Sequence, residues 1–447
     1  MARHALATWR HRAPNEGRAT IRNLAIATVF AGVAGYVVIL LATLTLGAQN
    51  FDVFNVFWAA FFTLSGIVQG LMHETTRSVG AADVSSVMTS PMNGAGQSGG
   101  GSVTVRSDAA DTPNRAKPIR VAGWFAAGWA LLVAATSPLW AAAMFPAGHS
   151  AIVTVLLTVS VCGFALQSAV GGLLSGREQW NSYALIVGGE ALLRLVAGCV
   201  AYIVGGGTVA FYFVTVAGIV TTPLLLLLPR VRAPLALVAD VSPREFVRHT
   251  LQAMAAASAA TVLVVGFPVL VRLTHPDASS LLSSNLLLAV LLTRAPILVP
   301  LQAFQNAIVV YFVKRKSQGR RSLLVPVAAI ITIGVVGAGA AWLVGPWLFS
   351  LMGDGFAISG ELLALLTIAS SFTGTLFVTG AATLAMGHHN HYLLGWWIAI
   401  ATVIITLVLV QGLVQATTIA LLVGPALGAI WHGAVGMRTA RRVSTGN

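Results

Sequence analysis

The sequence predicts an all-α integral membrane protein with about twelve transmembrane helices, arranged as two groups of six. The composition is the first reason, because the 447 residues are 57% hydrophobic and only 9% charged, whereas roughly one quarter of a soluble domain is charged. The second is the repeated occurrence, from end to end, of apolar segments of about 20 residues, the length that crosses a bilayer as a helix. The distribution of positive charge is the third.

Apolar segments of spanning length set the expected helices. Their approximate bounds are 24–46, 53–73, 121–144, 150–174, 183–204, 209–228, 247–271, 281–312, 323–349, 357–386, 391–411 and 415–436. At a rise of about 1.5 Å per residue, each can cross the hydrocarbon layer.

Lysine and arginine residues mark one side of these segments. If the N-terminus is cytoplasmic, 23 of the 26 cations lie on the cytoplasmic side, Arg272 lies outside, and Arg194 and Arg294 lie within spans. The positive-inside rule therefore predicts that both termini are cytoplasmic. The net charge of +13 then reflects topology and attraction to anionic lipid, and we expect no nucleic-acid partner.

An Arg- and Pro-bearing segment at 229–248 divides the spans into six and six, a layout typical of two repeated lobes. The lobes are expected at 24–228 and 249–436. The remaining regions are a basic cytoplasmic N-terminal segment 1–23, a Gly- and Ser-rich loop 80–118 expected to be flexible, the cytoplasmic linker 229–248, and a cytoplasmic tail 437–447. A weak internal echo between "LLSGREQWNSY" and "LAMGHHNHY" makes Gly176 and Gly387 equivalent.

Motifs typical of enzymes do not occur in the chain. None of its three lysines belongs to a phosphate-binding loop, so ATP hydrolysis is not expected. The acids expected outside the membrane are far apart in sequence and give little support to paired acid/base catalysis. The segment "GHHNH" at 387–391 fits an interfacial turn better than a metal site. We therefore expect no enzymatic activity, cofactor or metal.

Polar side chains inside the spans are the candidate site, because a charge in the membrane is costly unless it faces a cavity or a partner. Near the end of the second span, Gln69, His73 and Arg77 recur at four-residue spacing on one helical face. Glu74 precedes Arg77 by three residues, within reach of an ion pair. This pattern fits either a cavity wall or a polar helix end with an internal ion pair.

In the fifth span, Glu190 and Arg194 are spaced i, i+4 with the acid first, the order that favours an intrahelical pair. Counted from Tyr183, Arg194 lies roughly 16 Å into the membrane. A self-neutralised pair that only packs, and a pair that handles a substrate, both remain open.

In the eighth span, Arg294 has no acid at i±3 or i±4. Gln305 returns to nearly the same helical face, with Gln302 beside it, so we expect this face to line a wet cavity. The competing interpretation is an acidic partner from another helix, such as Glu361 or Glu190.

Two further patterns concern helix geometry. Pro296 and Pro300 follow the arginine of the eighth span and predict a bent or broken helix at its depth. The tenth span carries hydroxyl residues at strict four-residue spacing, for which hydrogen bonds back to the helix are the preferred account. These are Thr367, Ser371, Thr375, Thr379 and Thr383.

Five stretches, taken in order, resemble the polysaccharide or lipid-linked oligosaccharide flippases (Wzx-like) of the superfamily that also contains multidrug and toxin extruders. They are "FNVFWAAFFTLSGIVQGLMHETTRSV", "GLLSGREQWNSYALIVGGEALLRL", "LLTRAPILVPLQAFQNAIVVYF", "LFSLMGDGFAISGELLALLTI" and "LAMGHHNHYLLGWW". The resemblance implies two six-helix lobes around a central cationic cavity that opens alternately to each side and handles a polyprenyl-type diphosphate sugar. Arg77, Arg194 and Arg294 match the arginine positions, whereas the long Gly/Ser insertion departs from the pattern.

Residues and resemblance together predict a flippase of the inner (plasma) membrane that moves a polyprenyl-diphosphate-linked saccharide to the outer leaflet for cell-envelope assembly. The expected substrate site consists of Arg77, Arg194, Arg294, Glu74, Glu190, Gln69, His73, Gln302 and Gln305. Besides this substrate and the bilayer, envelope glycosyltransferases or a polymerase are candidate partners. The alternatives are a cation-coupled multidrug exporter, which would favour unpaired acids, and a non-transporting scaffold for envelope enzymes.

Overall fold

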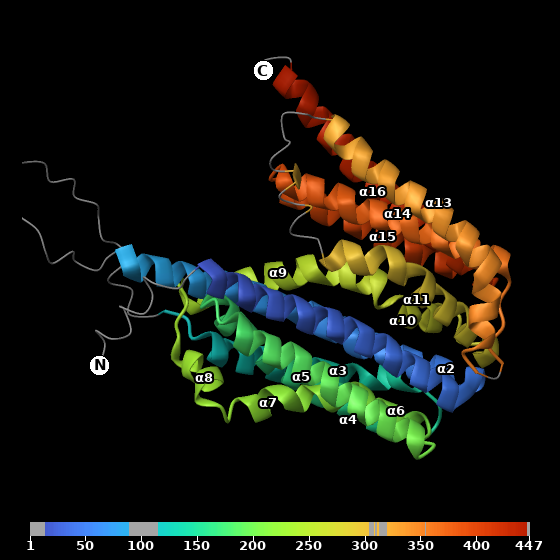
Figure 1. Cartoon of the computed structure of the whole chain (residues 1–447), viewed down its shortest axis with the longest axis horizontal. Coiled ribbons are helices and arrows are strands. Elements are labelled where there is room, and N and C mark those ends of the chain that lie inside the picture. Colours follow the sequence, from blue (N-terminus) through green and yellow to red (C-terminus); the bar gives the residue numbers. More distant parts are fainter. Residues whose placement is uncertain are drawn as a thin grey trace, which may run out of the picture.

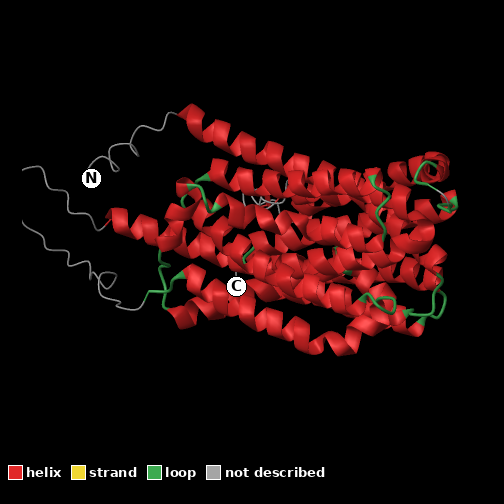
Figure 2. Cartoon of the chain, turned by 90° about the horizontal axis from the view of Figure 1, so that it is seen from below, coloured by secondary structure: helices red, strands yellow, loops and turns green. Residues whose placement is uncertain are grey.

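The computed structural model describes residues 14–88, 115–303, 308, 311–312, 320–353 and 355–444, and this part of the chain consists of helices and loops without a strand (Figure 2). Ten of its helices are long and apolar enough to cross a membrane, or eleven if one bent pair counts as a single span. The all-helical, multi-pass membrane fold expected from the sequence is confirmed.

The helices follow the expected spans closely. They are α2 Pro14–Met88, α3 Pro118–Met144, α4 Ser150–Gly176, α5 Trp180–Ile203, α6 Thr208–Val216, η1 Ala217–Val220, α7 Thr221–Leu225, α8 Pro229–Arg232, η2 Ala233–Ala236, α9 Pro243–Val264, α10 Phe267–Thr274, α11 Ser280–Ala303, α13 Arg320–Ser350, α14 Gly360–Ala385, α15 His389–Leu409 and α16 Leu413–Ser444. Because α2 continues to Met88, the start of the loop expected at 80–118 is helical. Its part from 89 to 114 lies outside the described residues.

Two antiparallel arms make up helix α2. Gly47 interrupts the helix with φ 62° and ψ 173°, a left-handed conformation that glycine adopts without steric cost. Near the ends of the two arms, Asn23 donates a hydrogen bond to Asn181 (3.1 Å), and Met72 accepts one from Tyr183 (3.5 Å), so both arms return to the start of α5. Counting α2 as two crossings and the bent pair as one gives the twelve expected.

Figure 1 shows how the two groups of helices are arranged. The α13–α16 group diverges from the rest of the molecule towards the end where α8 lies, and converges with it at the opposite end. At that opposite end the rings of Phe51 and Phe356 meet with centroids 5.7 Å apart. The side-chain amide of Asn285 donates to the carbonyl of Gly355 (3.1 Å) and accepts from the N–H of Ala357 (2.8 Å). The molecule is therefore fastened at one end.

The linker expected at 229–248 is mostly helical, because it contains α8, η2 and the start of α9. Helix α9 begins at Pro243 with a capping box, in which the Ser242 hydroxyl accepts from the Glu245 N–H and the Glu245 carboxylate accepts from the Ser242 N–H. Such reciprocal bonds satisfy two helix-end donors. The sequence pattern Ser-Pro-Arg-Glu was a signal for this boundary.

The hydroxyl stripe of α14 forms the hydrogen bonds expected for it. Each hydroxyl donates to the carbonyl four residues earlier, at 2.7–3.2 Å, and the five residues are Thr367, Ser371, Thr375, Thr379 and Thr383. All are buried. The preferred interpretation, back-bonding within the helix, is confirmed.

Candidate functional site

A cavity of about 510 Å³ lies between helices that precede the linker and helices that follow it. Both arms of α2 and helix α5 form one wall, and α9, α10 and α11 form the other. Glu190 and Arg194 reach it from α5, and Arg294 reaches it from α11. The structure therefore brings three of the residues singled out in the sequence to one cavity.

Arg194 is bonded on several sides at its corner of this cavity. Its Nη2 donates to Oε1 of Glu190 at 2.5 Å, and the other carboxylate oxygen of Glu190 accepts from Gln167 at 2.7 Å. The Nε of Arg194 donates to the carbonyl of Thr215 (3.1 Å), where α6 changes into the 3₁₀ helix η1. The ring of Phe62 lies 5.1 Å from the guanidinium carbon. The i, i+4 pair expected from the sequence is present, and its charge is neutralised.

Gly218 makes room for this pair. A Cβ at position 218 would overlap Cγ of Glu190 and lie 2.8 Å from Nη2 of Arg194. The α5 pair therefore depends on a close approach of η1 that any side chain would prevent.

Arg294 occupies a corner built in a related way but with different partners. Helix α9 ends at Val264, α10 begins at Phe267, and the two are bent by 66°. In a continuous helix the carbonyl of Val264 would accept from residue 268, but Pro268 has no N–H. Arg294 takes the donor's place, with Nη1 2.9 Å from that carbonyl and 3.5 Å from that of Leu263. Its guanidinium lies 5.1 Å from the ring centre of Phe267.

No carboxylate balances the charge of Arg294 among the described residues. The side chain is buried, at 6% exposure, and its Nη2 has no hydrogen-bond partner. The side-chain amide nitrogen of Asn55, on the same cavity and 1% exposed, also has none. Buried donors of this kind are costly unless something supplies acceptors. The sequence left open an acidic partner for Arg294, but in the described structure its hydrogen-bond partners are backbone carbonyls.

The helix break expected beside Arg294 lies in a neighbouring span. Helix α11 continues through Pro296 and Pro300 to Ala303, so of the bent or broken helix expected there, a break is absent from the described part of this span. The break instead separates α9 from α10, where Gly266 disfavours helix and Pro268 removes a donor.

Arg77 lies outside this cavity and is paired with two carboxylates. Its Nε donates to Glu74 (2.9 Å) and its Nη1 to Asp240 of the linker (3.2 Å). Glu74 also lies 3.4 Å from the imidazole of His249, and the N–H of Asp240 donates to the carbonyl of Ser78 (3.2 Å). The arginine therefore fastens the end of α2 to the linker, the structural one of the two interpretations left open for this stripe.

Of the four remaining sequence candidates, two lie away from the cavity and two lie outside the described residues. Gln69 contacts the sulfur of Met72 at 3.6 Å, and His73 is exposed on the same helix; neither lines the cavity. Gln302 belongs to the last turn of α11, but its side chain lies outside the described residues, as does the whole of Gln305.

Several residues that line the cavity or contact its arginines were not singled out from the sequence. Asn55 is a lone amide in the apolar run "FNVFWAAFF", which was a usable signal. Pro268, in "GFP", marks the break that frees a carbonyl for Arg294. The rings of Phe62 and Phe267 carried no such signal, because phenylalanine is common throughout the spans.

Comparison with known proteins adds relatives and a fold. No known family model matches the chain. It is 36% identical over 417 residues to the uncharacterized protein Rv1510 of Mycobacterium tuberculosis (strain H37Rv), covering 93% of this chain and 91% of that protein. It is 34% identical over 411 residues to the uncharacterized protein Mb3654 of Mycobacterium bovis, covering 92% and 90%.

Among solved structures, the chain is similar to a multidrug resistance MATE family transporter of the MOP superfamily in its inward-facing conformation, with a TM-score of 0.65, 14% identity, and coverage of 95% of this chain and 98% of that one. An outward-facing MATE structure has a TM-score of 0.60 at 14% identity, covering 96% of each chain. A MOP superfamily transporter from Pyrococcus furiosus has 0.63 at 13% identity, covering 96% and 97%. The chain therefore belongs to the family of the two mycobacterial proteins and has the fold of the MATE transporters of the MOP superfamily.

Proposed function

We propose that the chain is an alternating-access flippase that moves a polyprenyl-diphosphate-linked saccharide from the inner to the outer leaflet for cell-envelope polysaccharide assembly. The observation that carries this proposal is the guanidinium of Arg294, which is buried on a cavity wall with one nitrogen unpartnered and no carboxylate among its described contacts. Diphosphate oxygens suit the planar fork of an arginine, and a charge-assisted bond of this kind contributes about 1.5–3 kcal/mol.

Arg194 would complete the site from the opposite wall. Its bond to Glu190 holds the guanidinium in place in the absence of substrate, and a diphosphate would compete with the carboxylate for it. Each arginine also bonds to a carbonyl at a helix irregularity, Thr215 or Val264. An anion bound to both would thus act directly on two places where the helices can bend, as alternating access requires.

The shape of the molecule supports an assignment of its two ends. The helix groups converge at the Phe51–Phe356 end and diverge at the other, and the diverging end carries α8 with Arg230 and Arg232. By the positive-inside rule this end faces the cytoplasm, with both termini. Single cysteines introduced at Ser98 or Ser317 should not react with impermeant reagents in intact cells, whereas one at Ser279 should react. Labelling of the cysteine at position 98 or 317 from outside would contradict this topology.

The multidrug alternative has weaker support. Among the described residues that line the cavity, only Glu190 is acidic, and both its oxygens are already bonded, to Arg194 and Gln167. The Pyrococcus furiosus transporter is described as having a binding pocket of reverse polarity that suggests a different function. That description supports the view that pocket charge follows the substrate within this fold.

The test is transport by the purified chain in proteoliposomes loaded with a fluorescent polyprenyl-diphosphate saccharide. We expect the wild type to make the probe accessible to an external quencher, Arg294→Gln to be inactive, and Arg294→Lys to be impaired because a point charge replaces a fork. The matched control is Arg232→Gln, which removes an exposed arginine of α8 that lies outside the cavity. Wild-type transport by Arg294→Gln would refute the proposal, and loss of folding in both Arg294 variants would assign the residue a structural role.

A further inference from the structure

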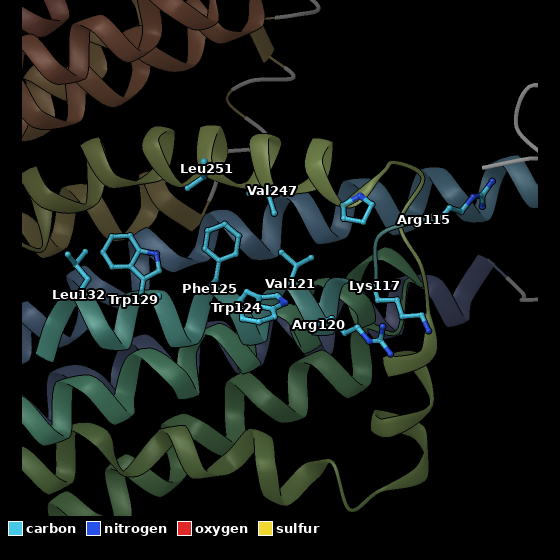
Figure 3. A pocket seen from close by; sticks show the side chains of 12 residues that line it. Arg115, Lys117, Arg120, Val121, Trp124, Phe125, Trp129, Leu132, Val247 and Leu251 are labelled. Carbon is cyan, nitrogen blue, oxygen red and sulfur yellow. The ribbon is translucent and has the colours of Figure 1, made fainter. Parts of the chain in front are cut away.

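A second cavity, of about 690 Å³, lies between α3 and the first turns of α9. Its lining divides by chemistry along its length, as Figure 3 shows: cationic side chains gather at one end, and rings and aliphatic side chains continue along the rest. The cations are Arg115, Lys117 and Arg120; the apolar side chains include Val121, Trp124, Phe125, Trp129, Leu132, Val247 and Leu251. None of the described residues that line it is acidic. We call this cavity the α3–α9 groove.

The cationic end of the groove is held in place by backbone contacts. The N–H of Ala116 donates to the carbonyl of Val241 (3.0 Å), and the carbonyl of Ala116 accepts from the N–H of Ala239 (2.8 Å). These bonds fix the segment before α3 against the linker before α9. Pro118 then starts α3, which places Lys117 and Arg120 at the head of the helix.

The remainder of the groove is open and apolar. Trp124 is 80% exposed, and a Cβ at Gly128 would meet no atom within 4 Å. From Arg120 to Leu132 the helix rises about 18 Å, slightly more than the roughly 15 Å of one leaflet of hydrocarbon. A cationic mouth followed by an apolar wall of one leaflet's depth has the shape of an anionic amphiphile.

We propose that the α3–α9 groove binds an anionic phospholipid, with its phosphate at Lys117, Arg120 and Arg115 and an acyl chain along the wall from Trp124 to Leu132. The cationic end of the groove favours an anionic headgroup. The long apolar wall favours a lipid over a free phosphate, which has no apolar part to place there. The groove shares no lining residue with the cavity of Arg194 and Arg294, which favours a resident phospholipid over the transported substrate.

Such a lipid would contact both halves of the molecule, because α3 precedes the linker and α9 follows it. Its occupancy would therefore favour the conformation in which these two helices lie side by side. This inference does not depend on the identity of the transported substrate, and its test below measures no transport.

The experiment uses the full-length chain, purified in detergent and incubated with equal amounts of phosphatidylglycerol and phosphatidylcholine, followed by native mass spectrometry. We expect the wild type to retain phosphatidylglycerol in preference, and Lys117→Gln/Arg120→Gln to retain roughly tenfold less, since each cation near the headgroup contributes to binding. The matched control, Arg230→Gln/Arg232→Gln, removes two cations from α8 that do not line the groove, and should leave retention unchanged.

A second variant tests the apolar part. Gly128→Phe should fill the groove and lower retention of the lipid without loss of thermal stability, since its Cβ would meet no atom within 4 Å. Gly123→Phe, on the same helix, also faces open space but does not line the groove, and should retain the lipid. Full retention by Gly128→Phe, or equal loss in the two phenylalanine variants, would overturn the proposal.

Competition identifies the occupant. Inorganic phosphate added in excess should not displace the phospholipid, because it offers nothing to the apolar wall. Displacement by phosphate would reduce the groove to an anion site, and stoichiometric displacement by undecaprenyl diphosphate would assign it to substrate instead; either result would refute a resident phospholipid. Equal retention of phosphatidylcholine would refute the anionic preference.

Discussion

The two arginines on the central cavity occupy corners of similar construction but different net charge. Each donates to a backbone carbonyl at a helix irregularity and lies about 5 Å from a phenylalanine ring, Phe62 or Phe267. Arg194, however, is bonded to Glu190, whereas Arg294 bonds only to carbonyls and leaves Nη2 without a partner. One corner is neutral and the other carries a net positive charge.

This difference in charge predicts different roles for the two arginines, one in stability and one in ligand binding. A buried pair such as Arg194–Glu190 is costly to break from either side, because the remaining charge has no compensation. A buried arginine without a carboxylate is itself the uncompensated charge, and an anionic ligand would relieve it. We therefore expect Arg294 to contribute more to anion affinity and Arg194 more to stability.

Stability should show the largest contrast. Arg194→Met should lower the free energy of unfolding by about 3–5 kcal/mol, because it leaves Glu190 buried with one neutral partner. Arg294→Met should change it by less than about 1 kcal/mol, because removal of a buried charge offsets the lost carbonyl bond. Chemical unfolding in mixed micelles measures both, with Arg232→Met, at an exposed arginine of α8, as control; equal losses at the two corners would remove the distinction.

Coupling between Glu190 and Arg194 should be of intermediate size. A double-mutant cycle of Glu190→Gln and Arg194→Ala, measured by chemical unfolding, should give an interaction energy of about 1–3 kcal/mol in the free energy of unfolding. In transport, Glu190→Gln should be weaker than wild type but active, and Arg194→Ala should be worse. Additive effects in the cycle would mean that the two side chains act independently.

Space at the Arg194 corner can be removed without changing its charges. Gly218→Ala should lower the free energy of unfolding by about 1–3 kcal/mol, because the added methyl group overpacks against Glu190 and Arg194. Thermal unfolding measures this loss. Gly339→Ala, at a helical glycine with open space, is the control and should not destabilise. An unchanged melting temperature in Gly218→Ala would show that the α5 pair tolerates displacement.

The smallest effect is expected at the break beside Arg294. Pro268→Ala restores an N–H that competes with Arg294 for the carbonyl of Val264, so the bend between α9 and α10 should decrease. Stability should change by under about 1 kcal/mol. Spin labels on α9 and α10 report the angle through their separation, and an unaltered separation would mean that packing, rather than the missing donor, sets the bend.

The sequence was sufficient to predict much of the fold, because hydrophobic length and charge asymmetry act locally. It also predicted the Glu190–Arg194 pair, since i, i+4 neighbours on a helix meet whatever surrounds them. The extents of α2 and α9 were underestimated, because polar residues at a helix end do not distinguish a helix that leaves the membrane from a loop.

Partners distant in sequence could not be predicted in the same way. Arg77 pairs with Asp240, which is 163 residues away, so a cavity role and a structural role remained equally open from the spacing. Arg294 bonds to backbone carbonyls 30 and 31 residues before it. A carbonyl has no signature in the sequence, and only the packing of α9 against α11 brings it within reach.

Binding of a polyprenyl diphosphate tests the central contrast most directly. In detergent, with a fluorescent analogue and at fixed salt, Arg294→Gln should weaken binding by roughly tenfold or more. Glu190→Gln should instead tighten it, because it releases Arg194 for the anion while Arg294 stays in place. Opposite changes in Kd are the predicted result; unchanged binding in Arg294→Gln, or equal weakening in both variants, would contradict the assignment of the principal anion contact to Arg294.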